Sequence, residues 1–244
     1  MSKVIVITGA GLGLGRALAR RFAKEGEQVV LLGRTLEKLQ AVERELGASA
    51  LAIRCDVSSA ESVRSAFAHI AERHTRIDVL INNAAVYEPF LIAEATDEQI
   101  LQSLTTNIAG AAFCSRAAIP MLGRGGHIIN VSSESVDMLQ LPHMVMYQCS
   151  KAGLERFTLG LQRELEPSGI RVTSVRAGAM FEAGKTFNAD RNALIRFHKA
   201  AADAGIDLRA KALTHVDSAT QVFRFLIDMP EDLQTLTLSL AARR

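Results

Sequence analysis

The chain has 244 residues, of which 48% are hydrophobic and 22% charged, a composition typical of a globular protein with a substantial core. Its 28 Lys and Arg against 26 Asp and Glu leave a net charge of +2, too small to indicate binding to nucleic acid or to an anionic membrane. Three cysteines without metal-ligand spacing predict a reducing compartment. Since neither a signal peptide nor a membrane-spanning run is evident, we expect a cytoplasmic protein.

Short apolar runs alternate with helical patterns along the chain. Helices are predicted at about 14–25, from 35 to about 47, from 59, at about 97–122, and from the region of Tyr147 toward 166. Buried strands are predicted at 4–7, 29–32, 50–53, 79–81, 127–131, 170–175 and 235–240. This alternation predicts an α/β fold in one domain over residues 1–244, a doubly wound parallel sheet of seven strands with helices on both faces.

Residues 180–215 interrupt the alternation after the sixth predicted strand. The segment is long and irregular to helical in pattern. Ligands of open α/β sheets lie beyond the carboxyl ends of the strands. We therefore expect this segment to be a substrate lid, with a surface insertion as the alternative.

A glycine-rich turn, Thr8-Gly9-Ala10-Gly11-Leu12-Gly13-Leu14-Gly15, joins the first predicted strand to the first predicted helix. Small residues let the backbone approach a phosphate, and the first turn of a helix offers free N–H groups. We predict that this turn holds the pyrophosphate of a dinucleotide. The alternative is a glycine-rich turn that binds no nucleotide.

Polar residues follow the next three predicted strands. Arg34 stands near the end of the second strand, where a carboxylate would bind the ribose of NAD and an arginine suits the 2′-phosphate of NADP. Asp56 follows the third strand and could accept from an adenine amino group, although a turn cap is the favoured interpretation. Asn82-Asn83-Ala84-Ala85 follows the fourth strand and by itself predicts a turn.

Tyr147 and Lys151 are four residues apart and therefore share one face of a predicted helix. A nearby ammonium can lower the pKa of a phenol, which makes tyrosine a general acid or base. A solvated pair is the alternative. Combined with the glycine-rich turn, the pair predicts redox chemistry at a carbon that bears oxygen.

These motifs, together with Asn107, Ser132-Ser133 and Arg176-Ala177-Gly178, occur in an order that resembles the short-chain dehydrogenase/reductase family over about residues 3–180. The resemblance implies a Rossmann-like fold and an NADP(H)-dependent oxidoreductase that interconverts a ketone or aldehyde and an alcohol. NAD(H) is the alternative cofactor. The six histidines have no ligand spacing, so we expect no metal site.

The resemblance also implies roles for individual residues. Tyr147 would be the acid/base, Lys151 would lower its pKa and hold the nicotinamide ribose, Ser133 would polarise the substrate oxygen, and Asn107 would hold a water of the proton relay. The residues implied to bind the cofactor are Gly9, Leu12, Gly13, Leu14, Arg34, Asp56, Val57, Asn83, Ala84, Ala85, Tyr147, Lys151, Gly178 and Met180.

The chain departs from the family pattern in several places. Ala85 stands where glycine is usual, Ala177 where proline is usual, and the spacing from Ser133 to Tyr147 is one residue longer than expected. The alternatives are an NADP(H)-binding sensor without catalysis, an NAD-dependent alcohol dehydrogenase of the same fold, or an epimerisation or dehydration on the same scaffold.

The expected partner is a small carbonyl or alcohol substrate of hydrophobic character. This expectation rests on apolar residues before Tyr147 and in the predicted lid: Met138, Leu139, Leu141, Met144, Val145, Met146, Phe181 and Phe187. The resemblance further implies a homodimer or homotetramer, built on the helix at 97–122 and the helix that carries Tyr147.

Overall fold

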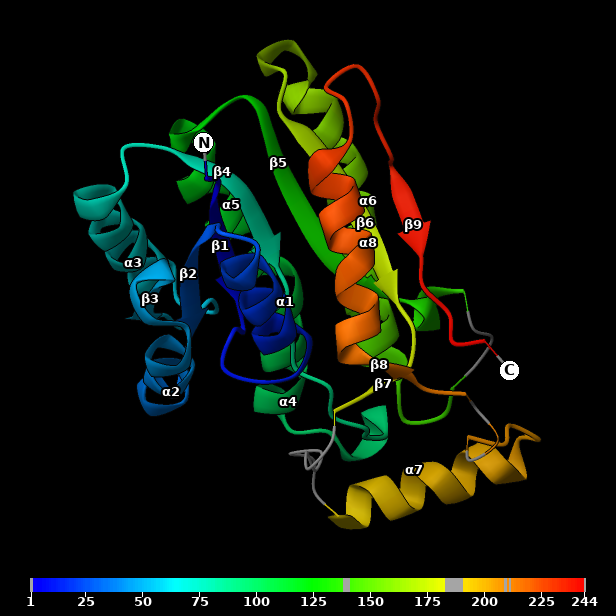
Figure 1. The fold of residues 1–244 in the computed structure, drawn as a ribbon. Coiled ribbons are helices and arrows are strands. Elements are labelled where there is room, and N and C mark those ends of the chain that lie inside the picture. The colour runs from blue at the N-terminus through cyan, green and yellow to red at the C-terminus, as the bar shows by residue number, and fades with distance from the viewer. Residues whose placement is uncertain (1, 138–140, 183–190, 209, 211, 244) are drawn as a thin grey trace.

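The computed structural model of the protein describes residues 2–137, 141–182, 191–208, 210 and 212–243 (Figure 1). Seven strands form one sheet in the order β3-β2-β1-β4-β5-β6-β9, and every neighbouring pair is parallel. The strands are β1 (Val4–Thr8), β2 (Gln28–Gly33), β3 (Ala50–Arg54), β4 (Ile77–Asn82), β5 (Leu122–Ser133), β6 (Arg171–Ala177) and β9 (Thr237–Ser239). The predicted α/β fold with a seven-stranded parallel sheet is confirmed.

Helices cover both faces of this sheet (Figure 1). One face packs against α1 (Gly13–Lys24), α2 (Leu36–Leu46) and α8 (Val216–Asp228), and the other against α3 (Ala60–Arg73), α5 (Gly110–Ala118) and α6 (Val145–Leu165). Alternate residues of β1 divide between the two cores, with Ile5 and Ile7 on the α1 side and Val6 on the α3 side. Successive side chains of a strand point to opposite faces, and both faces of this sheet are buried. Positions 4–7 of the strand are therefore all apolar, which explains the continuous apolar run in the sequence.

The helix predicted at 97–122 is interrupted. It comprises α4 (Asp97–Leu104), a π-helical turn at Thr105–Ala109, α5 and a 3-10 turn at Ile119–Met121. Residue Leu122 already belongs to β5 and pairs with Ile77, before a register shift in the pairing with β4. The sequence did not predict this early start of β5, because positions 123, 125 and 126 are glycines and glycine is depleted in strands.

The segment 180–215 contains helix α7 (Arg191–Asp203) and is bounded by a two-stranded pair, β7 (Met180–Phe181) with β8 (Thr214–His215). Figure 1 shows α7 beyond the carboxyl ends of the strands, outside both helical layers. Helix α8, which directly follows β8, has no counterpart among the predicted elements.

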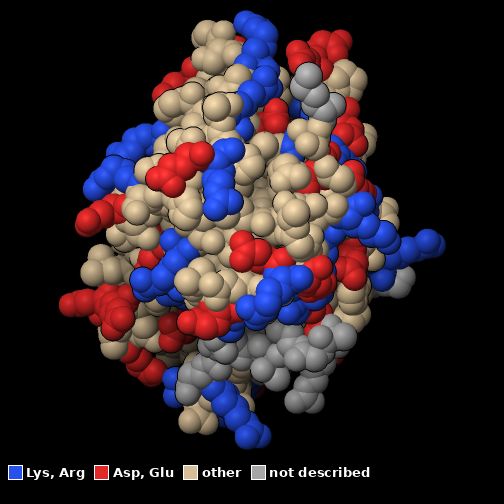
Figure 2. Space-filling view, turned by 60° about the vertical axis from the view of Figure 1, so that its left-hand side comes forward, with Lys and Arg blue, Asp and Glu red and all other residues tan. Residues whose placement is uncertain are grey.

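On the face shown in Figure 2, acidic and basic side chains are mixed, in keeping with the small net charge. Among the described residues, none of the helices combines the length and the apolar character needed to cross a membrane.

The carboxyl ends of β1 and β4 are joined by side-chain hydrogen bonds. The Asn83 amide donates to the Thr8 carbonyl at 2.9 Å, and the Thr8 hydroxyl accepts from the Asn83 and Ala84 N–H groups at 3.0 Å each. Helix α1 packs tightly on this junction, since a Cβ on Gly15 would overlap the Gly9 carbonyl oxygen and lie 2.7 Å from the Asn83 amide nitrogen.

Gly15→Ala should therefore lower the free energy of unfolding by about 1–3 kcal/mol, because the added methyl group overpacks this junction. Gly160→Ala on α6 is the matched control. Nothing lies within 4 Å of its added methyl group, so the change should raise stability by about 0.5–1 kcal/mol through helix propensity. Urea unfolding measures both. A Gly15→Ala chain as stable as the parent would mean that the turn readily accommodates a side chain.

Candidate functional site

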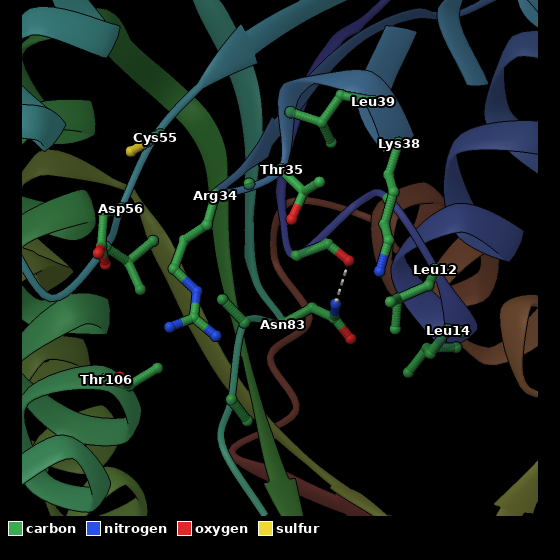
Figure 3. Close-up of a pocket in the computed structure, with 17 residues that line it drawn as sticks. Leu12, Leu14, Arg34, Thr35, Lys38, Leu39, Cys55, Asp56, Asn83 and Thr106 are labelled. Carbon is green, nitrogen blue, oxygen red and sulfur yellow. Dashed lines mark hydrogen bonds between the residues drawn. The ribbon is translucent and has the colours of Figure 1, made fainter. Parts of the chain in front are cut away.

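A cavity of about 330 Å³ lies at the carboxyl ends of β1, β2 and β3 and the chain that follows β4 (Figure 3). The sheet order places β1 beside β4, so the chain turns to opposite sides of the sheet at this point. Open α/β sheets bind ligands at such a switch point. Ten residues predicted to bind the cofactor line this one cavity: Gly9, Leu12, Gly13, Leu14, Arg34, Asp56, Val57, Asn83, Ala84 and Ala85.

The wall between β2 and α2 carries two positive charges. Arg34 and Lys38 are exposed, and Figure 3 shows the guanidinium and the ammonium both directed into the cavity. Sequence reasoning missed Lys38. Its position in the first turn of α2 brings its Cβ 3.1 Å from where a Cβ of Gly11 would lie, so helical spacing after the strand end could have identified it.

Asp56 faces the cavity from the end of β3 and also caps the next turn. Its Oδ1 accepts from the Ser58 N–H at 3.0 Å and from the Ser58 hydroxyl at 2.7 Å. The cap interpretation is therefore correct, and the carboxylate still lines the cavity. Asn83, read from sequence alone as a turn residue, fastens the glycine-rich turn to β4.

A second group of predicted residues meets at the end of β5. The side chain of Tyr147, in the first turn of α6, lies close to the side chain of Ser133. One turn on, Lys151 is 2% exposed; its Nζ donates to the Val131 carbonyl at 2.8 Å and lies 5.9 Å from the centroid of the Tyr147 ring. Ser132 turns away and donates to Glu155 at 2.8 Å. The longer spacing between Ser133 and Tyr147 thus leaves Ser133, not Ser132, as the partner of the phenol.

Asn107 supports α6 from the π-helical turn, a distortion frequent at functional sites. Its Nδ2 donates to the Ser150 hydroxyl at 2.9 Å and to the Val86 carbonyl at 3.1 Å, and its Oδ1 accepts from the Val86 N–H at 2.8 Å. The Ser150 hydroxyl donates in turn to the Tyr147 carbonyl at 2.8 Å. Asn107 is therefore connected to Tyr147 through Ser150 and the backbone.

Burial shifts the pKa values of both Tyr147 and Lys151. Burial raises the pKa of Tyr147, the hydrogen bond from Ser133 opposes the rise, and the charge of Glu134 adds to it. Burial also lowers the pKa of Lys151 to about 8. Loss of solvation therefore favours the neutral form of each group, and a lowering of the pKa of Tyr147 by Lys151 stays a prediction.

Apolar side chains surround Tyr147. The Tyr87 ring meets it edge-on at 5.0 Å, and burial raises the pKa of Tyr87 to about 12. Phe197 of α7 joins the same cluster, so the segment 180–215 contributes to this environment. Phe181, by contrast, is 44% exposed and packs on His215. Met138, Leu139 and Phe187 lie outside the described residues.

The chain after β6 supplies the last two predicted residues, Gly178 and Met180, which do not line the cavity. A Cβ on Gly178 would lie 2.5 Å from the Leu240 carbonyl oxygen. The next N–H, that of Ala179, donates to Glu134 Oε1 at 3.0 Å. The carboxylate next to Ser133 therefore fastens this turn, which lacks the proline usual in the family.

Known proteins resemble this chain in sequence and in fold. The family model described as short chain dehydrogenase matches residues 3–190. The chain belongs to the short-chain dehydrogenase family. The D-xylose 1-dehydrogenase of Caulobacter vibrioides is 36% identical over 181 residues, 72% of this chain and 71% of that protein.

The NADP-dependent 3-hydroxy acid dehydrogenase of Salmonella typhi is 34% identical to this short-chain dehydrogenase over 180 residues, 72% of this chain and 71% of the relative. A short chain dehydrogenase from Burkholderia cenocepacia in complex with NADP superposes with a TM-score of 0.82 at 28% identity, covering 98% of this chain and 96% of that one. Family membership, expected from the order of motifs, is confirmed and makes the protein an oxidoreductase.

The buried Lys151 should cost this short-chain dehydrogenase stability. Its pKa is about 8 in the folded chain against an ordinary 10.5, so between these values the unfolded chain binds more protons and stability rises with pH. Lys151→Met should raise the free energy of unfolding at pH 7 by roughly 1–3 kcal/mol. This gain should shrink as the pH rises from 8 toward 10.5.

Urea unfolding at several pH values measures this difference, with Lys199→Met, an exposed lysine of α7, as the control that should change little. A Lys151→Met chain that is less stable than the parent at pH 7 would mean that the hydrogen bond to Val131 outweighs the cost of burying the ammonium.

Proposed function

We propose that this short-chain dehydrogenase interconverts a ketone or aldehyde and the corresponding alcohol with NADP(H), and that Tyr147 is the acid/base. The observation that carries the proposal is the juxtaposition of the Tyr147 and Ser133 side chains, with Lys151 one helical turn away and the cavity at the neighbouring strand ends.

The residues present fit a dinucleotide. Gly9 has φ +67°, and a Cβ there would lie 3.0 Å from the Ala84 Cα. A side chain on Gly9 or on Gly15 would therefore crowd the turn, and their absence leaves the backbone accessible to a ligand. The N-terminus of α1, which includes Gly13 and Leu14 of the cavity lining, favours an anion. When bound, the nicotinamide would supply or accept the hydride.

Arg34 and Lys38 support NADP(H) over NAD(H). Two cations directed into the cavity favour a ligand with an additional phosphate, and an arginine suits phosphate geometry. The Salmonella relative is named NADP-dependent, and the Burkholderia structure contains NADP. We assign Arg34 and Lys38 to the 2′-phosphate, and Asp56 to the adenine.

In reduction, Tyr147 donates its proton to the substrate oxygen while Ser133 donates a hydrogen bond to the same oxygen. The raised pKa of Tyr147 keeps the phenol protonated at neutral pH, as this direction requires. Lys151 would hold the nicotinamide ribose, and Asn107 positions the first turn of α6 through Ser150.

A hydrophobic substrate is supported by the apolar cluster of Leu141, Met144 and Phe197 around Tyr147 and Tyr87. We further propose that the chain forms homodimers or homotetramers through α4 and α6. These helices expose Leu101, Leu104, Val145 and Leu159, which a second copy could cover.

Tyr147→Phe should bind NADPH as the parent does and lose turnover by a factor on the order of 10²–10⁴, the usual contribution of a general acid. The measurement is a panel of ketones and aldehydes followed at the absorbance of NADPH, with cofactor titration by fluorescence. Tyr87→Phe, which removes the other tyrosine hydroxyl, is the control and should retain most turnover. Unchanged turnover in Tyr147→Phe removes this residue from the acid/base role.

Arg34→Asp should lower the ratio of kcat/KM for NADPH over NADH by roughly tenfold to a hundredfold, because a charge-assisted phosphate contact is lost and a carboxylate repels the 2′-phosphate. Arg44→Asp makes the same charge change on an exposed part of α2 outside the cavity. Equal ratios in the two variants would contradict the role assigned to Arg34.

A further inference from the structure

Glu182, which directly follows β7, reaches the N-terminus of α1, far away in sequence. Its Oε2 accepts from the Gly13 N–H at 2.9 Å, and its Oε1 accepts from Arg16 Nε at 3.0 Å and from Arg16 Nη2. The side chain is 9% exposed. The carboxylate of Glu182 is therefore buried against the glycine-rich turn and held there by hydrogen bonds.

The sequence of α1 explains why an anion settles there. The first turn of this 12-residue helix contains no acidic residue, and its N-cap, Leu12, makes no side-chain cap hydrogen bond. Free N–H groups and the positive end of the helix dipole attract a negative charge. Glu182 supplies that charge across 169 residues of sequence.

Gly13 also lines the cavity that we assign to the dinucleotide. A single N–H group cannot make a full hydrogen bond to the carboxylate and to a pyrophosphate oxygen at once, and two anions at this distance repel one another. The pyrophosphate and the carboxylate of Glu182 therefore compete for the same place.

We propose that Glu182 sets the cofactor affinity of this protein: its carboxylate occupies the pyrophosphate position on α1, and the dinucleotide binds by displacing it. The inference rests on the proposed function, in which the glycine-rich turn holds NADP(H). Every contact that Glu182 loses opposes binding, and the displacement leaves the guanidinium of Arg16 beside the incoming phosphates.

Displacement also acts on the chain next to the substrate site. Met180 and Phe181 of β7 pair with Thr214 and His215 of β8, which lead directly into α8. Because Glu182 directly follows β7, displacement of its carboxylate removes the hydrogen bonds that join this end of β7 to the N-terminus of α1.

The test compares dissociation constants of NADPH for the parent chain, Glu182→Gln and Glu182→Ala by calorimetry. Both variants should bind NADPH more tightly, on the order of tenfold, since each removes at least one charge-assisted contact that competes with the cofactor. Adenosine 2′-monophosphate carries the 2′-phosphate but no pyrophosphate. Its affinity should stay unchanged in the variants.

Glu45→Gln is the matched control, because Glu45 of α2 pairs with Arg20 of α1, the helix that Glu182 contacts, and does not line the cavity. It should leave the affinity for NADPH unchanged. Thermal melting verifies that each variant is folded, and the two substitutions at Glu182 provide independent chances of a folded chain.

The outcomes separate the inference from the proposed function. If the parent chain binds NADPH and both Glu182 variants bind it equally or more weakly, the competition is refuted while the proposed function stands. A gain of the same size for adenosine 2′-monophosphate also refutes it, because the effect would then be a general charge effect. If the parent chain binds neither NADPH nor NADH, the proposed function fails and this inference fails with it.

Discussion

The hydrogen bonds between Asn83 and Thr8 are the constraint on which the site depends. They join the ends of β1 and β4 where the chain switches sides of the sheet, and Gly15 can pack on the Gly9 carbonyl only because that turn is held in one place. Buried amide and hydroxyl groups are stable there because each finds a partner. This junction fixes the position of the glycine-rich turn, and with it the wall of the cavity and the first N–H groups of α1.

A second constraint is the conflict between burial and charge around α6. Lys151 and Tyr147 are both shifted toward their neutral forms, which a structure selected only for stability would avoid. The free-energy cost of burying these two groups is offset by the pairing of β5 with its two neighbouring strands and by the Asn107–Ser150 hydrogen bond, which hold α6 against the end of the sheet. Positioning of the pair is therefore a property of the whole central sheet and not of the helix alone.

Local sequence patterns were sufficient for the fold, and the resemblance to the family named most of the residues that line the cavity. The strand runs, the glycine-rich turn and the order of motifs located ten cavity residues, because each of these residues lies within a few positions of a strand end. Lys38 was missed, although its place in the first turn of α2 brings it to the cavity. Asn107 was identified only through the resemblance to the family, because it lies in a π-helical turn that hydrophobic periodicity does not predict.

Contacts between distant segments were outside the reach of pattern reasoning for a physical reason. Which anion occupies the N-terminus of α1 is decided by free energy, not by sequence neighbourhood, and a carboxylate 169 residues away meets the requirement. The same geometry that suits a pyrophosphate suits Glu182, since both present oxygen atoms with negative charge to the same N–H group. A site built for an anionic ligand is thus also a site for the chain's own carboxylates, and its apparent affinity is the difference between the two interactions.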